Sequence, residues 1–454
     1  MTPELIEKYD QRLPRYTSYP TAPHFGASVD EATYRGWLGE LDRDASASVY
    51  LHVPFCRQLC WYCGCHTSAV NRTELVTAYG HLLGREIEFL GGAIGFRLAV
   101  HNIHWGGGTP SILSQVEMEL VMEALDESFA IAPDAEISIE LDPRELTSQR
   151  SRQLAQLGVN RASLGVQDFD PKVQQAVNRI QPYEMTAGAV AGLREAGINS
   201  INFDLMYGLP YQTVESVRDT AERAADLRPE RIALFGYAHV PWMKRRQTLI
   251  PEAALPGPYD RFEQSEIAAE ALTRSGYVRV GLDHFALRDD RLAGMTGNDR
   301  VTRNFQGYTT DENPVLLGVG VSSIGRLPQG YVQNTTEVSV YRDRLRYERL
   351  PTVRGIGFDD EDRLRGAVIE RLMCDLSVDL AAEAARFGRS PDCFESELRR
   401  LEPFVADGIA VRDGLKVQVT EEGRPLLRTV AALFDAYLAA PSSEAAPPRH
   451  SKAV

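Results

Sequence analysis

The chain has 454 residues, of which 43% are apolar, and a formal net charge of −14 at pH 7. This length suits one large domain with additions, and the acidic balance argues against a general nucleic-acid-binding protein. There is no apolar run of about 18 residues and no apolar signal core at the start, so we expect a cytoplasmic protein without a membrane insertion.

Residues 1–45 are predicted to form an N-terminal arm. The segment PRYTSYP, residues 14–20, is flanked by prolines, which disfavour a helix. Its two tyrosines and one arginine are more than an exposed linker needs. We therefore expect this segment to pack against the rest of the protein.

An alternation of strands and helices begins at about residue 46 and predicts a core domain over residues 46–240. Short apolar and β-branched runs alternate with segments of helical spacing. The predicted strands are 48–53, 100–105, 136–141, 161–166, 200–206 and 231–237, and the predicted helices are 74–90, 115–129, 148–157, 183–196 and 214–227. This order predicts a parallel α/β sheet, and periodicity alone leaves open whether it is an open doubly wound sheet or a β/α barrel.

Polar or glycine-rich segments follow all six predicted strands. In a β/α barrel these strand ends form the active site. They are the cysteine-rich loop, the glycine run 106–108, Glu140, Gln167, Asp204 and His239. Any one of them can be a helix cap, but six together indicate a functional rim.

The alternation fades after residue 240. Residues 241–330 are predicted to extend the barrel and to cover the active site. A bridge over residues 331–360 opens a mostly helical C-terminal domain, residues 331–440, whose strand pair near 408–419 indicates a winged-helix-like shape. It lacks a basic recognition helix, so we expect a covering or docking role. The biased tail, residues 441–454, is expected to be disordered.

Four of the six cysteines lie within ten residues of one another. Cys56, Cys60 and Cys63 have the spacing C-x3-C-x2-C. Three thiolates can bind three irons of a cubane cluster and leave the fourth iron open to a substrate or cosubstrate. A structural zinc site usually needs two separated cysteine pairs, and a disulfide suits a secreted protein, so the spacing favours the cluster.

The run HVPFCRQLCWYCGCHT, residues 52–67, resembles the radical S-adenosylmethionine superfamily, where an aromatic residue, here Tyr62, precedes the third cysteine. With Gly64 and Cys65 after that cysteine, it is most similar to the oxygen-independent coproporphyrinogen III oxidases. PRYTSYP and RNFQGYTT, residues 303–310, match the same family. The resemblance implies a partial β/α barrel of six units, a [4Fe–4S] cluster and two molecules of S-adenosylmethionine. Cys65 is not expected to be a cluster ligand.

The resemblance also implies a set of site residues. The cluster-bound S-adenosylmethionine is contacted by Tyr50, Gly107, Glu140 and Ile324. The second molecule is contacted by Tyr62, Gly108, Thr109, Gln167, Arg179, Asp204 and Ala238. Tyr50, Glu140, Gln167 and Asp204 are the candidate catalytic residues. Candidates for contacts to substrate carboxylates are basic: Arg15, Arg303, Lys244, Arg245 and Arg246. The last three can equally be a solvated surface, and Arg15 can belong to a surface strap.

The implied reaction is the oxidative decarboxylation of two propionate groups of coproporphyrinogen III, which gives protoporphyrinogen IX for heme synthesis through 5′-deoxyadenosyl radicals. The resemblance implies an electron donor like flavodoxin or ferredoxin and leaves the acceptor unidentified. Nothing like a heptad seam demands a partner subunit, so we expect a monomer.

Three other functions stay open at this point. They are a heme-binding chaperone, a heme-cleaving radical methyltransferase and a non-catalytic iron–sulfur or zinc protein. Gly64, Cys65 and RNFQGYTT argue against the chaperone, and PRYTSYP argues against the methyltransferase.

Overall fold

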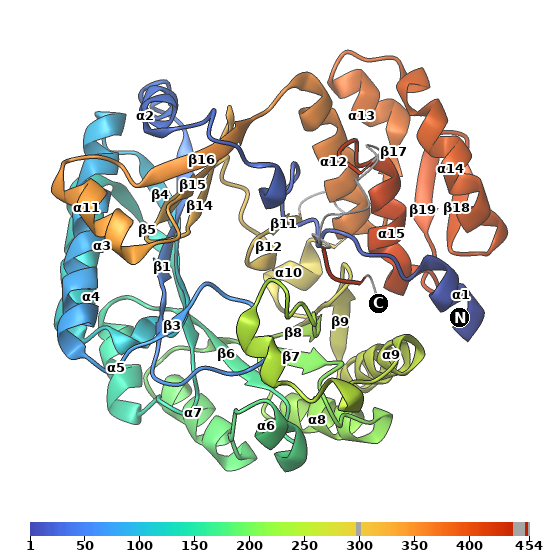
Figure 1. Cartoon of the computed structure of the whole chain (residues 1–454), viewed down its shortest axis with the longest axis horizontal. Helices are drawn as coiled ribbons and strands as arrows, with labels where there is room; N and C mark the ends of the chain where they lie inside the picture. Colours follow the sequence, from blue (N-terminus) through green and yellow to red (C-terminus); the bar gives the residue numbers. More distant parts are fainter. Residues whose placement is uncertain (297–300, 439–449, 453–454) are drawn as a thin grey trace.

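Six β/α units in sequence order form the middle of a twelve-stranded sheet (Figure 1). The computed structural model describes residues 1–296, 301–438 and 450–452. The parallel strands of these units are β1 (Ser46–Val53), β4 (Ala99–Gly107), β5 (Ala130–Leu141), β6 (Arg161–Gln167), β7 (Ser200–Tyr207) and β8 (Arg231–Gly236). The helices between them are α3 (Thr73–Ile94), α4 (Gln115–Ser128), α5 (Ser148–Gln156), α6 (Pro171–Ala176), α7 (Tyr183–Glu195) and α8 (Val214–Asp226). The predicted alternation and the α/β partial barrel are confirmed.

The helices lie along the outside of the curved sheet (Figure 1). Each buries an apolar stripe against the strands, as Leu83, Ile87 and Leu90 do on α3, where their spacing places them on one face. The start of α4 is fixed by a capping box, in which the side chains of Ser114 and Glu117 bind each other's backbone N–H groups. Local capping and the apolar stripes therefore explain why these segments are helical.

Strands that were not predicted extend the sheet at both edges. At one edge β13 (Val315–Val319) pairs with β1 in parallel, and β14 (Ile324–Leu327), β15 (Gly330–Asn334) and β16 (Thr352–Gly357) follow in antiparallel order. At the other edge β10 (His284–Leu287) and β9 (Tyr277–Val280) follow β8, and α9 (Pro258–Arg274) lies beside α8. Smaller elements are the pairs β2 (Phe55–Cys56) with β3 (Ser68–Ala69) and β11 (Thr302–Asn304) with β12 (Gly307–Thr309), and the helix α10 (Arg291–Gly294).

The domain boundary expected at residue 331 lies elsewhere. The backbones of β15 and β16 pair within the main sheet, and α11 (Val338–Arg346) buries Tyr341 and Leu345 in the main core. Residues 331–357 therefore belong to the barrel, and not to a bridge. The C-terminal domain begins with α12 (Asp360–Asp375).

The C-terminal domain contains α12, α13 (Leu380–Arg386), α14 (Glu395–Ala406) and α15 (Leu427–Ala431), with a small sheet of β17 (Ser377–Asp379), β19 (Lys416–Val419) and β18 (Ala410–Asp413). The predicted strand pair is β18 and β19. Of the tail expected to be disordered, residues 441–449 and 453–454 lie outside the described residues. Among residues 450–452, Ser451 accepts a hydrogen bond from the backbone N–H of Leu13, at 3.0 Å.

The N-terminal arm contacts both parts of the molecule. Its helix α1 (Pro3–Tyr9) buries Ile6 and Tyr9 in the core of the C-terminal domain, where Tyr16 and Tyr19 are also buried. Its second helix, α2 (Glu31–Gly39), packs on the barrel core. The expectation that PRYTSYP packs against the protein is confirmed. No helix in the described parts of the chain is long and apolar enough to cross a membrane.

Candidate active site

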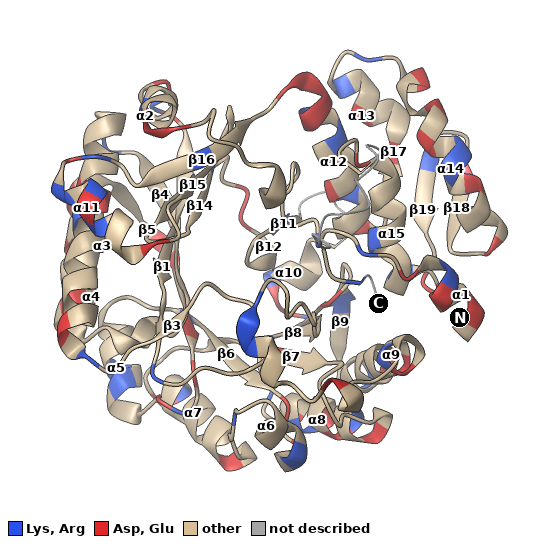
Figure 2. Ribbon diagram, viewed as in Figure 1, with Lys and Arg blue, Asp and Glu red and all other residues tan. Residues whose placement is uncertain are grey.

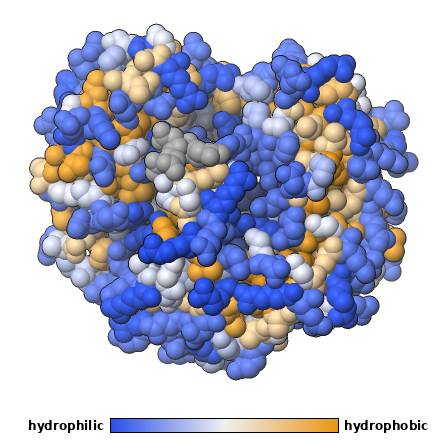
Figure 3. All heavy atoms as spheres, turned by 180° about the vertical axis from the view of Figure 1, so that it is seen from behind, coloured by the Kyte–Doolittle hydropathy of each residue, from blue (hydrophilic) through white to orange (hydrophobic). Residues whose placement is uncertain are grey.

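A cavity of about 680 Å³ runs along the inside of the curved sheet to the carboxyl ends of its parallel strands. Seen from behind, the surface is hollowed near the middle, and hydrophilic side chains gather along the hollow (Figure 3). Most predicted site residues line this cavity: Cys56, Cys60, Cys63, Tyr62, Gly107, Gly108, Thr109, Glu140, Gln167, Arg179, Asp204 and Ala238. The candidates Arg15, Arg303, Lys244 and Arg246 line it as well.

Tyr50 and Ile324 are not among the residues that line the cavity. They lie close behind it, because Tyr50 on β1 is in register with Gly318 on β13, which lies against Ile324 on β14. The Tyr50 ring stacks on His104, with centroids 5.8 Å apart, and its hydroxyl group is 3.0 Å from Nδ1 of His52. These contacts place Tyr50 next to the wall that carries Glu140.

The cysteine loop is anchored at both ends and in the middle. Its two ends pair as β2 and β3, and the N–H of Trp61 donates to the carbonyl oxygen of Val177 at 3.0 Å. Arg246 donates to the carbonyl oxygen of Thr67 at 2.7 Å, and the Lys244 ammonium lies 3.4 Å from the carbonyl oxygen of Cys65. The basic run of residues 244–246, blue near the centre of Figure 2, therefore supports this loop, and only Arg245 is exposed.

Polar donors point at two of the three predicted ligand thiols. The Thr109 hydroxyl group donates to Sγ of Cys56 at 3.6 Å. Arg179 and Arg144 donate to Sγ of Cys60, at 3.4 and 3.6 Å. A metal-bound thiolate accepts hydrogen bonds of this kind, so these donors suit the sulfurs of ligand cysteines.

In the described part of the chain, no three His, Cys, Asp or Glu side chains converge closely enough to hold one metal ion. That convergence is what a structural zinc site requires. A cubane cluster takes one thiolate per iron, so its ligands stand apart. Cys56, Cys60 and Cys63 line one cavity, as three ligands of a cubane cluster would.

Glu140 is held on the cavity wall by two hydrogen bonds. Nε2 of His104 is 3.2 Å from its Oε1, and the N–H of Gly107 donates to its Oε2 at 3.0 Å. Burial alone raises the pKa of Glu140, but these two contacts and the His104 charge outweigh burial, and the pKa lies below its ordinary value. Glu140 is therefore an anion that faces the cavity.

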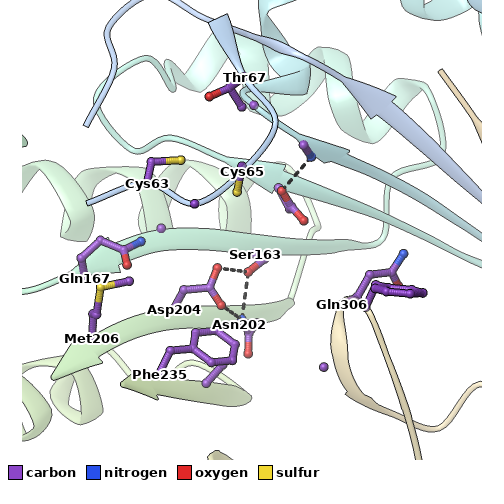
Figure 4. Close-up of a pocket in the computed structure, with 18 of the residues that line it drawn as sticks. Cys63, Cys65, Thr67, Ser163, Gln167, Asn202, Asp204, Met206, Phe235 and Gln306 are labelled. Carbon is purple, nitrogen blue, oxygen red and sulfur yellow. Dashed lines mark hydrogen bonds between the residues drawn. The ribbon is translucent and has the colours of Figure 1, made fainter. Parts of the chain in front are cut away.

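Asp204 forms a triad with Ser163 and Asn202 on two neighbouring strands, opposite Cys63 and Cys65 (Figure 4). Its carboxylate accepts from the Ser163 hydroxyl group at 3.1 Å and from Nδ2 of Asn202 at 2.9 Å. Burial, together with the charge of Glu140, raises the pKa of Asp204 to about 6.

Arg179 is the most constrained cation of the site. It donates to Asp142 at 3.3 Å, to Cys60 and to the carbonyl oxygen of Gly165. Its Nε is buried and has no hydrogen-bond partner among the described residues. Nearby Gln167 has a φ of +66°, a conformation that costs a non-glycine residue energy and is typical of functional sites.

The glycine run keeps the backbone of the cavity wall free of side chains. A Cβ on Gly106 would lie 2.8 Å from both the Glu140 carboxylate and the Tyr50 ring. A Cβ on Gly108 would lie 2.4 Å from the carbonyl oxygen of Phe55, just before Cys56. The run therefore lets the wall and the cysteine loop approach each other closely.

These residues fit the implied cofactors. The three thiols with their cationic donors suit a cluster, and an orphaned guanidinium N–H together with the anions Glu140 and Asp204 suits a ligand that carries carboxylate, ammonium and hydroxyl groups. The predicted roles of individual residues stay predictions.

Four residues of this site were missed from the sequence: Arg144, His104, Ser163 and Asn202. Two of them carried a usable signal. Arg144 follows a strand end in the segment Asp-Pro-Arg, and Asn202 precedes Asp204 by two positions, which places both on one face of a strand. His104 and Ser163 carried no signal that distinguishes them from ordinary strand residues.

The chain resembles known proteins over nearly its whole length. Residues 50–224 match the sequence model of the radical SAM superfamily, and residues 358–426 match the HemN C-terminal domain. The chain is 50% identical over 439 residues to the oxygen-independent coproporphyrinogen III oxidase of Bradyrhizobium diazoefficiens, with 96% of this chain and 98% of that protein covered. It is 39% identical over 435 residues to the oxidase of Escherichia coli of the same name, with 96% and 95% covered.

The solved structure of coproporphyrinogen III oxidase (HemN) from Escherichia coli, described as a radical SAM enzyme, superimposes with a TM-score of 0.88 at 37% identity. The match covers 94% of this chain and all of that one (100%). The family expected from the cysteine loop is thus confirmed: the chain belongs to the oxygen-independent coproporphyrinogen III oxidases of the radical S-adenosylmethionine superfamily.

Proposed function

We propose that this chain is an oxidoreductase that converts coproporphyrinogen III to protoporphyrinogen IX without oxygen, in heme biosynthesis. Family membership implies a [4Fe–4S] cluster and S-adenosylmethionine as cofactors. One observation carries the proposal: the loop of three cysteines opens onto the same cavity as the anions Glu140 and Asp204. A cluster and an organic ligand can therefore share one enclosed space.

The reaction removes one hydrogen atom and carbon dioxide from each of two propionate side chains. When bound, the cluster and S-adenosylmethionine supply the radical chemistry that removes a hydrogen atom from the propionate carbon attached to the pyrrole ring. The carboxylate leaves as carbon dioxide, one electron passes to an acceptor, and a vinyl group remains. The protein supplies orientation and keeps water from the reacting carbon.

Cys56, Cys60 and Cys63 are the residues that hold the cluster. Thr109, Arg144 and Arg179 donate hydrogen bonds to two of these sulfurs. Donors and positive charge at the sulfur atoms favour a more reduced cluster, because they stabilise added negative charge.

Glu140 and Asp204 orient S-adenosylmethionine. Glu140 is anionic and accepts hydrogen bonds from an ammonium group, while Asp204 accepts from ribose hydroxyl groups. The unpartnered Nε of Arg179 binds a carboxylate. Gly107 and Gly108 present their backbone groups to the cavity, where they contact the ligand. Tyr50 acts from behind the wall, where it contacts His104 and His52.

We extend the proposal to several finer points. The cavity holds two molecules of S-adenosylmethionine, since residues implied for both line it together. Tyr62, Thr109, Gln167 and Ala238 belong to the second. The enzyme acts as a cytoplasmic monomer and takes its electron from a protein like flavodoxin or ferredoxin.

The test is an anaerobic turnover assay with reconstituted protein, a reductant, S-adenosylmethionine and coproporphyrinogen III. We expect protoporphyrin after oxidation of the product, with about two 5′-deoxyadenosines per product molecule because two propionates react. The Cys63→Ser variant serves as the inactive control. Cleavage of S-adenosylmethionine without protoporphyrin would show that the substrate is a different one. If protein with an intact cluster formed neither protoporphyrin nor 5′-deoxyadenosine, the proposal would be refuted.

A further inference from the structure

A second cavity, of about 280 Å³, lies between the barrel, the N-terminal arm and the C-terminal domain. It adjoins the main cavity, because Arg15, Gly236, Tyr237, Ala238 and Arg303 line both. A large ligand in the main cavity can therefore extend a side chain past these residues into the second one. The mechanism described above gives this space no role.

Six arginines line the second cavity, and four of them come from distant parts of the chain: Arg15 from the arm, Arg261 from α9, Arg303 from β11 and Arg428 from α15. The fold makes room for them, since a Cβ on Gly208 would lie 2.6 Å from Nη1 of Arg261. Arg15 is exposed, and it lines both cavities. Arg428 is buried, with an exposed fraction of 6%.

Only two carboxylates among the described residues, Asp283 and Glu252, line this cavity beside six arginines, so its carboxylates do not balance its positive charge. Asp283 is committed to Arg303, to which it is joined by two hydrogen bonds of 3.3 Å, and also contacts His284. Arg15 donates to the carbonyl oxygen of Gly236 at 2.8 Å, and Arg428 donates to that of Lys452 at 2.8 Å. A carbonyl oxygen satisfies an N–H group but carries no net charge to offset the cation.

Arg428 also keeps an unused donor. Its Nε is buried and has no hydrogen-bond partner within the described residues. Burial, with repulsion from Arg15 and Arg303, lowers the pKa of Arg428 to about 10, so the fold holds this charge at a cost. A buried cation without a matching anion is unfavourable for stability and typical of a binding site.

We propose that the second cavity is a carboxylate subsite, in which Arg428 and Arg15 bind the propionate groups of the tetrapyrrole that do not react. This inference rests on the proposed function, which supplies the substrate class. The substrate carries four propionates and the reaction consumes two, so two carboxylates persist through both rounds. Guanidinium groups bind carboxylates in bidentate pairs, and such pairs fix orientation as well as position.

The subsite explains why the arm and the C-terminal domain both reach the active site. Each contributes an arginine that the barrel alone does not have, Arg15 and Arg428. A substrate anchored by these arginines presents its other propionates in the main cavity, toward the loop of Cys56, Cys60 and Cys63.

The test measures binding and not turnover. Coproporphyrin III, the stable oxidised form of the substrate, is titrated into the full-length protein and followed by its fluorescence. We expect Arg428→Gln and Arg15→Gln each to raise the dissociation constant about ten- to hundredfold, and Arg428→Lys to recover part of that loss. Arg412→Gln removes an exposed charge from the same C-terminal domain, outside both cavities, and should bind normally.

Deuteroporphyrin IX sharpens the test, because it keeps only the two propionates that do not react. Arg428→Gln should weaken its binding by the same factor. Melting temperature provides a second readout: Arg428→Gln should be at least as stable as the wild type, because it loses a charge that no carboxylate balances. Coproporphyrin III should raise the melting temperature of the wild type more than that of the variant.

The outcomes separate this inference from the proposed function. Equal porphyrin affinity for the wild type, Arg428→Gln and Arg15→Gln would overturn the subsite, even if the wild type turns over coproporphyrinogen III. Weaker binding of S-adenosylmethionine by these variants, with unchanged porphyrin binding, would likewise overturn it, because the arginines would then serve the cofactor. Arginine-dependent porphyrin binding in a protein that forms no protoporphyrinogen would support the subsite and refute the reaction.

Discussion

Replacement of Gly108 by alanine should displace the cysteine loop. A Cβ there would lie 2.4 Å from the carbonyl oxygen of Phe55, whereas ordinary contact begins at 3.4 Å, so the two backbones must separate by about 1 Å. No flexible side chain can absorb this shift. The N–H groups of Gly108 and Thr109 donate to the carbonyl oxygens of Val53 and Phe55, at 2.7 and 2.8 Å, and bind the two segments together.

A misplacement of about 1 Å at an active site can cost about 100-fold in rate, or about 2.7 kcal/mol of transition-state stabilisation. We expect this loss in kcat/KM for Gly108→Ala, because Cys56 follows Phe55 directly. Iron content should fall less than activity does, since all three thiols remain. Iron analysis and the visible absorbance of the cluster measure the loss of cluster. The rate of anaerobic protoporphyrinogen formation, measured on the same sample, gives the loss of activity.

The matched control is Gly188→Ala on α7, where no atom lies within 4 Å of the added Cβ. It should keep full activity and gain about 0.4–1 kcal/mol of stability, because alanine restricts the unfolded chain. If Gly108→Ala kept the kcat/KM of the wild type, contact with the glycine run would not set the position of the cysteine loop.

Three further predictions concern other parts of the molecule. Cys63→Ser should abolish the cluster absorbance, while Cys65→Ser should keep it; equal loss in both variants would refute the three-ligand assignment. Burial raises the pKa of Glu86 to about 7, so its contribution to stability is present below pH 4.5 and lost as pH rises through 7. Between pH 4.5 and 7 the free energy of unfolding of the wild type should fall by about 3 kcal/mol relative to that of Glu86→Gln. Melting temperatures of the two proteins that change in parallel with pH would contradict this. Asp283→Asn should destabilise the fold by about 3–5 kcal/mol, because it leaves Arg303 buried without its anion, and adding Arg303→Met should restore much of the loss if this cause is correct.

The sequence predicted the barrel well where its pattern was local. Each β/α unit carries its own apolar period, and α4, α5 and α8 also have side-chain caps, so every predicted strand and helix of residues 46–240 is present. The edge strands were not predicted, because their pattern is not local. Gly330–Asn334 and Thr352–Gly357 are short, and they are strands because they pair with each other and with β14, which no local pattern shows.

The residues of the candidate site were likewise predicted only where their signal is local. The cysteine spacing, the glycine run and the carboxylates at strand ends were visible because they follow directly from position along a strand or loop. The second role of Lys244 and Arg246, as supports of the cysteine loop, was not visible. Neither was the meeting of Arg15 with Arg428, because residues more than 400 positions apart become neighbours only through the packing of the whole chain.

The two ends of the chain are joined by contacts that have a consequence for its synthesis. The hydroxyl groups of Tyr16 and Tyr9 donate to Asp435 and Asp407, which lie 419 and 398 positions later. The helix α1 also contacts α9, but these two tyrosines meet their carboxylate partners only after Asp407 and Asp435 have been made. These two contacts of the arm therefore form last. A chain cut short before α15 would have the cysteine loop but lack Arg428, so from the subsite proposed above we expect it to bind porphyrin weakly.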